Sequence, residues 1–198
     1  MHAYAVAPDT RWRAQPLVVA ASLMSAWFLL RALSSTSLAV PWWVDVPSAL
    51  GFYGLWCGVY DRFLWRSRLV RLFGLGTVDL RGEWIGILRS SYDGFEANVT
   101  VNVRIEQTSR LMRMRLTTDK SESTTTGSML ESDGESASLR YFFVSHPRSD
   151  SPGSMHAHYG SGFLELRDGY LTGDYFTGRD RATHGHLSLC RRDRQPHN

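Results

Sequence analysis

The sequence has few cysteines and almost no lysine. Only Cys57 and Cys190 occur among the 198 residues. Two such widely separated cysteines cannot form a disulfide framework, which suits a reducing compartment for the C-terminal part of the chain. Lys120 is the only lysine, so nearly all cationic side chains are guanidinium groups. Arginine suits planar recognition of phosphate, although a GC-rich genome produces the same bias.

Residues 79–198 lack a net positive charge. They carry 15 Lys+Arg against 16 Asp+Glu, whereas residues 1–78 carry seven arginines against three acidic residues. The basic isoelectric point therefore belongs to the N-terminal part. A polyanion-binding surface on the C-terminal part is not indicated, and we expect no DNA or RNA partner. Arginines beside apolar segments are explained by membrane topology.

Long apolar runs are confined to the first 75 residues. Residues 14–30 and 46–60 are uncharged, and each run is shorter than the roughly 20 residues that a spanning helix needs. Flanking residues can extend both, so we predict two transmembrane helices at about 14–33 and 46–65. A signal sequence followed by an interfacial helix is the alternative. Arginines precede the first run and follow the second, which predicts a multi-pass protein with both termini in the cytoplasm.

From residue 79 onward no helical period is present, and apolar and polar residues alternate instead. Val99, Val101 and Val103 occupy one face of such a segment, while polar residues occupy the other. The pattern predicts eight strands, at 79–92, 97–107, 110–118, 121–130, 139–145, 156–166, 170–177 and 183–191. Short connections favour an antiparallel meander closed into a lipocalin-like β-barrel over residues 76–192, with 193–198 as a tail. A β-sandwich is the structural alternative.

A series of short motifs follows the two apolar segments. In order, they are Gly82-x-Trp84-x-Gly86, Ser90-Ser91-Tyr92, Ile105-Glu106-Gln107, Ser121-x-Ser123, Tyr141-x-Phe143, His158-x-Gly160 and Gly173-x-Tyr175-Phe176-Thr177-Gly178-Arg179. Together with the architecture, this order resembles the two-helix β-barrel effectors associated with bacterial CD-NTases in CBASS anti-phage defence. The resemblance covers roughly residues 15–190.

The resemblance implies a receptor in the bacterial inner membrane. A cytoplasmic barrel would bind a cyclic dinucleotide made by a partner CD-NTase. The chain would then form a homo-oligomer, and its helices would disrupt the lipid bilayer and kill the infected cell. It implies no enzymatic activity and no cofactor besides the activating ligand.

A cyclic dinucleotide requires cations for its phosphates, aromatic rings for its bases and polar groups for the base edges. The candidates for phosphate are Arg140 and Arg179. The candidates for stacking are Trp84, Tyr92, Tyr141 and Tyr175. The candidates for base edges are Gln107, Ser121, Ser123, His158 and Thr177.

Each candidate also has a purely structural interpretation. Trp84 fits a hydrophobic core as readily as a stacking site, and Gln107 could satisfy a neighbouring backbone. Arg113 and Arg115 alternate with Met112 and Met114, so they face solvent if the methionines face inward.

Other functions remain open from the residues alone. The pairs His156/His158 and His184/His186 could chelate Zn²⁺, but a third ligand is not evident. Serines are plentiful, yet no nucleophile elbow is present. The strongest rival is a membrane-tethered lipocalin-like barrel for an apolar small molecule. That function predicts an apolar lumen, whereas a nucleotide receptor needs polar groups and arginine inside.

Overall fold

The computed structural model describes residues 1–7, 10–34, 45–133, 136–148, 156–179 and 181–192. The chain divides into two compact units. One unit comprises residues 9–77 and is helical. The other combines residues 1–8 with residues 78–198 and consists of β-strands.

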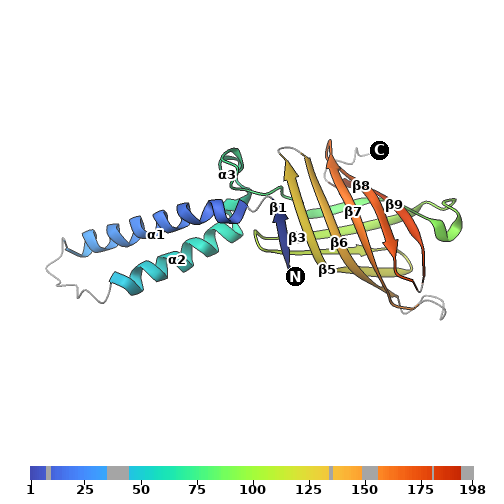
Figure 1. The fold of residues 1–198 in the computed structure, drawn as a ribbon, viewed down its shortest axis with the longest axis horizontal. Coiled ribbons are helices and arrows are strands. Elements are labelled where there is room, and N and C mark those ends of the chain that lie inside the picture. The colour runs from blue at the N-terminus through green and yellow to red at the C-terminus, as the bar shows by residue number, and fades with distance from the viewer. Residues whose placement is uncertain (8–9, 35–44, 134–135, 149–155, 180, 193–198) are drawn as a thin grey trace. The chain divides into compact units, whose positions relative to one another are not determined.

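The helical unit contains α1 (Thr10–Ser34), α2 (Asp45–Arg62), the short η2 (Leu64–Arg66) and α3 (Arg68–Leu72). Helix α2 runs back along α1 (Figure 1), and Trp56 Nε1 donates a hydrogen bond to Ser25 Oγ at 3.0 Å. Over Trp12–Leu33, α1 is long and apolar enough to cross a membrane. No other helix in the described ranges meets this criterion, because the 18-residue α2 carries Asp45, Asp61 and Arg62 at its ends. The second crossing stays a prediction.

The β-unit is one sheet that closes on itself into a barrel (Figure 1). Its strands are β1 (His2–Ala7), β2 (Gly82–Ser90), β3 (Val99–Gln107), β4 (Leu111–Thr117), β5 (Ser121–Asp133), β6 (Ser136–Pro147), β7 (His158–Arg167), β8 (Tyr170–Thr177) and β9 (His184–Arg191). They pair in the order β1-β4-β3-β2-β9-β8-β7-β6-β5. All eight expected strands are present as β2–β9. Their alternating pattern places one face of each strand in the lumen.

The ninth strand, β1, was not expected from the sequence. It lies between β4 and β5, antiparallel to the first and parallel to the second. The hairpin of β4 and β5 pairs directly only near its turn, and a bulge between Thr125 and Gly127 then interrupts the register of β5. Thr125 Oγ1 accepts the N–H of Met114 at 2.9 Å at this point. Strand β1 fills the seam beyond it, so the first residues belong to the barrel and the sheet is not a pure antiparallel meander.

The barrel end where the chain enters at Val78 is filled by a hydrophobic core. Leu80 and Trp84 are fully buried there, and Trp84 Nε1 donates to the Leu80 carbonyl at 3.0 Å. Gln107 receives the Leu80 N–H at 2.9 Å and donates to the carbonyl of Val78 at 3.1 Å. Its amide also donates to Tyr4 Oη at 3.1 Å. These contacts close one end of the barrel and leave the other for a cavity.

Candidate ligand-binding site

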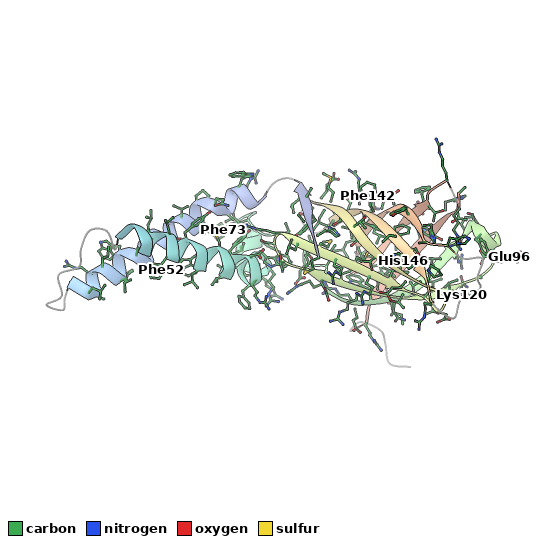
Figure 2. The ribbon with its side chains drawn as sticks, turned by 90° about the horizontal axis from the view of Figure 1, so that it is seen from below. Phe52, Phe73, Glu96, Lys120, Phe142 and His146 are labelled. Atoms are coloured by element: carbon green, nitrogen blue, oxygen red, sulfur yellow. The ribbon has the colours of Figure 1, made fainter. Side chains whose placement is uncertain are left out.

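The opposite half of the barrel contains a cavity of about 700 Å³. This volume lies within the usual range for small-molecule sites. The turn between β4 and β5 and the loops after β2 and β8 surround it. Figure 2 shows Lys120 and Glu96 at this end. Each of these loops follows a strand whose inward-facing residues line the cavity wall. The barrel therefore fixes the positions of the loops around the cavity.

Among the residues that the structure describes, two cationic side chains line the cavity. Arg181, from the loop after β8, lies over the ring of Tyr92 with its Cζ atom 5.3 Å from the ring centroid. Its Nη1 atom lies 3.5 Å from Nδ1 of His158. Lys120 lies in the turn between β4 and β5. Both cations border the cavity and are suited to contact an anionic ligand group. Arg181 is half-buried and Lys120 is exposed, so screening by water is restricted mainly at Arg181.

His158 is held mainly in its neutral form near neutral pH. Burial lowers its pKa, and the nearby Arg181 and His146 lower it further. A hydrogen bond from the ring to the carbonyl of His156, at 3.3 Å, works in the opposite direction. A neutral imidazole offers both a donor and an acceptor, which suits the edge of a base.

Aromatic rings occupy the wall formed by β6 and β8. Tyr141 and Phe143 are buried, and their ring centroids lie 5.9 Å apart. Tyr175 is half-buried, and burial raises its pKa, against the opposing effects of a hydrogen bond with Ser90 and the charge of Arg181. Burial also raises the pKa of Tyr141, with a smaller contribution from Tyr175. Both phenols therefore remain neutral at physiological pH.

Hydroxyl groups cover much of the remaining wall. Ser121, Ser123 and Thr125 follow one another along the inner face of β5. Thr177 is engaged within the loop after β8, because its Oγ1 contacts the carbonyl of Thr183 at 3.0 Å and accepts the Thr183 N–H at 2.9 Å. Apolar side chains also line the cavity, among them Leu88, Val99, Met114, Leu116 and Leu187.

Seven of the eleven candidates from the sequence line this cavity: Tyr92, Ser121, Ser123, Tyr141, His158, Tyr175 and Thr177. The alternating pattern brings these residues together because all except Tyr92 lie on inner strand faces. Whether they contact a ligand stays a prediction.

The other four candidates lie outside the cavity. Trp84 and Gln107 belong to the closed end of the barrel, where burial and backbone hydrogen bonds explain them. Arg140 faces outward and pairs with Glu131 at 2.9 Å. Arg179 is exposed and is not part of the lining. Arg115 is also outside and pairs with Glu122 at 3.1 Å, as expected if Met114 faces inward.

The sequence reasoning missed Arg181, Lys120 and Asp93 as lining residues. Arg181 and Lys120 lie in turns or loops, and Asp93 ends the short 3-10 helix η3 (Ser91–Asp93). At these positions no period of two indicates the direction of a side chain. Asp93 accepts the N–H groups of Phe95 and Ala97 at 3.2 and 3.1 Å, so it stabilises the loop that borders the cavity. The sequence did offer one signal for these residues. Each is a charged residue in a short connection between two strands whose inner faces line the cavity.

The possible zinc ligands do not converge. Within the described ranges, no group of three or more His, Cys, Asp or Glu side chains could hold a metal ion. His186 is exposed and pairs with Asp174 at 2.9 Å.

Comparison with known proteins assigns the chain to a family. The sequence model described as "Cap15, cyclic dinucleotide receptor domain" matches residues 76–191. The chain belongs to the Cap15 family. One Cap15 relative, CD-NTase-associated protein 15 of Staphylococcus schleiferi, is 28% identical over 164 residues, which cover 82% of this chain and 87% of the relative. The family resemblance identified from the motifs is thus confirmed. The matched domain contains the whole cavity lining.

Proposed function

We propose that this chain is the membrane effector of a CBASS system and that its barrel binds a cyclic dinucleotide. The observation that carries the proposal is the cavity itself, which lies within the region that matches the receptor domain. It combines Arg181 and Lys120 at the rim with tyrosines and hydroxyl groups on the wall. These are the groups that phosphates, bases and base edges require.

Arg181 would bind a phosphate, and its contact with Tyr92 would keep the guanidinium over the mouth of the cavity. Lys120 would provide the second cation on the β4–β5 side. Tyr175 would contact a base, and neutral His158 would read a polar edge. The proposal includes no catalysis: the ligand acts by binding.

The response would occur in the membrane. The partner CD-NTase supplies the ligand, the occupied barrels associate into a homo-oligomer, and the helices disrupt the bacterial inner membrane. The apolar helix α1 supports the membrane association. A second crossing by α2, with the barrel and both termini in the cytoplasm, completes the proposed topology.

Binding is tested with the full-length chain in detergent. The probes are 3′,3′-cyclic dinucleotides that contain adenine, guanine or uracil. We expect at least one to raise the melting temperature, and Arg181→Ala to weaken its binding about tenfold or more, as loss of a charge-assisted contact requires. Arg179→Ala is the matched control, because Arg179 lies in the same loop but outside the cavity. Equal loss in both variants, or no shift with any probe, would contradict the proposal.

The apolar part of the cavity lining supports one alternative function. Leu116 and Met114 could contact an apolar molecule, as in a lipocalin-like carrier. The same melting experiment with a medium-chain fatty acid separates the two. Stabilisation by the fatty acid and by no dinucleotide would favour the carrier.

A further inference from the structure

Tyrosine and glycine alternate across four neighbouring strands of the cavity wall. Tyr141 on β6 pairs with Gly162 on β7, which in turn pairs with Tyr175 on β8. Tyr175 pairs with Gly185 on β9. Residues directly opposite one another in a sheet present their side chains on the same face. All four positions therefore face the lumen, and every second position has no side chain.

The space above Gly162 is occupied by the ring of Tyr141. A methyl group added at residue 162 would lie 2.7 Å from Cε1 of that ring and would also clash with its Cζ and Oη atoms. The tyrosine ring therefore leans sideways over the glycine of the next strand. It does not stand upright in the lumen, which explains why a tyrosine that lines the cavity is only 4% exposed.

The same arrangement recurs at two other pairs, but Gly162 differs from them. A methyl group at Gly160 would meet Phe143, and one at Gly185 would meet Tyr175. At both of these positions it would also strike a backbone carbonyl of a neighbouring strand, which by itself requires glycine. At Gly162 the three nearest atoms all belong to Tyr141. The nearest obstacle to a methyl group at Gly162 is therefore a side-chain ring and not a backbone carbonyl.

We propose that Gly162 is a specificity-determining residue of the ligand site, because it receives the Tyr141 ring and keeps the lumen wide enough for two linked nucleotides. This inference rests on the proposed function. The interior of a protein is closely packed, so a ring displaced from the wall has only the cavity to enter. A larger residue at 162 would thus reduce the cavity from within by displacing Tyr141, without substituting any lining residue.

The test measures affinity for the cyclic dinucleotide that stabilises the wild-type full-length chain best. We expect Gly162→Ala to weaken binding at least tenfold. Gly127→Ala is the matched control: this β5 glycine also lies in the barrel, but its added methyl would make only an ordinary contact with Phe142 at 3.6 Å. We expect that variant to bind within about twofold of wild type.

A rescue experiment separates ring displacement from a general loss of stability. Tyr141 itself lines the cavity, so Tyr141→Ala alone is the reference. Adding Tyr141→Ala to Gly162→Ala removes the displaced ring, and we expect the double variant to bind within about threefold of that reference. A loss of strand stability alone would not be restored in this way. If Gly162→Ala does not fold but the double variant folds and binds, this result also supports a clash between the added methyl group and the Tyr141 ring.

Three results would overturn the inference while the proposed function stands. They are wild-type affinity in Gly162→Ala, a double variant that folds but binds much more weakly than Tyr141→Ala, and failure of both variants to fold. A wild-type chain that binds no dinucleotide overturns the proposed function and this inference together.

Discussion

Arg179 and Arg181 lie in one loop, yet their surroundings differ. Arg181 is half-buried over Tyr92 and close to His158, whereas Arg179 is exposed to solvent. An exposed arginine interacts weakly because water and salt screen its charge. The same charge inside the rim of a cavity interacts more strongly with an anion. The position of each guanidinium, and not the number of arginines, determines which one can serve the site.

The lowered pKa of His158 predicts a loss of stability in mild acid. In the unfolded chain this imidazole titrates near 6.5, and in the barrel burial lowers its pKa below that value. As the pH falls through 6.5 toward the folded-state pKa, the unfolded chain binds the proton first. The free energy of unfolding therefore decreases over that interval and is fully retained above it. We expect His158→Asn to show a smaller decrease than wild type.

Thermal melts between about pH 7.5 and about pH 5 measure this difference. His156→Asn serves as the control, because the side chain of His156 is exposed and the hydrogen bond to His158 comes from its backbone. A His158→Asn profile that parallels wild type would show that this histidine does not contribute to the acid sensitivity.

Strand β1 is the element that joins the beginning of the chain to the cavity wall. Tyr4 and Val6 are buried in the barrel core. The His2 ring lies 2.9 Å from Oγ1 of Thr125, which lines the cavity. The other end of β1 leads within a few residues to α1. One short strand therefore contacts the ligand site and precedes the apolar helix.

We expect Tyr4→Ala to destabilise the barrel by about 3–5 kcal/mol, the usual cost of removing a buried aromatic side chain. Tyr4 is 3% exposed, and its hydroxyl donates to the carbonyl of Thr108 at 3.0 Å. Denaturant unfolding of the full-length chain, followed by near-ultraviolet circular dichroism, measures the change. Ala5→Ser is the control, since Ala5 is an exposed neighbour on the same strand. Equal stability of the two variants would indicate that β1 is dispensable for the closed barrel.

At the scale of the whole molecule, the proposed function assigns sensing and response to different units. The barrel contains the cavity, and the helical unit contains α1, the apolar helix. A ligand can shift such a system only if it binds one state more tightly than the other. The proposed function requires that this preferred state be the associated one.

Liposomes that contain the full-length chain and an entrapped dye test this requirement. We expect the dinucleotide that stabilises the barrel to release the dye, because association of the barrels would bring the apolar helices together. Arg181→Ala should release little dye at the same ligand concentration, and Arg179→Ala should behave as wild type. Release without ligand, or equal release from both variants, would show that the cavity does not control the membrane.

Much of the barrel was predictable because a strand is a local pattern. Alternation located β2–β9, and it placed Ser121, Ser123 and Tyr175 on inner faces. The same rule could not tell that Trp84 lies in the filled half of the lumen and Tyr141 in the open half. That distinction depends on which strands meet at one level of the barrel, and alternation contains no information about it.

The sequence by itself determined the order of the parts: an apolar N-terminal segment, then alternating strands with the motifs of the Cap15 family. Only the tertiary structure decided that β1 completes the sheet, that Arg181 and not Arg179 borders the cavity, and that Gly162 makes room for Tyr141. The physical reason is the distance along the chain over which each effect acts. Periodicity and turn chemistry act between residues near in the chain, whereas closure of the barrel brings together residues that are more than one hundred positions apart, such as His2 and Thr125.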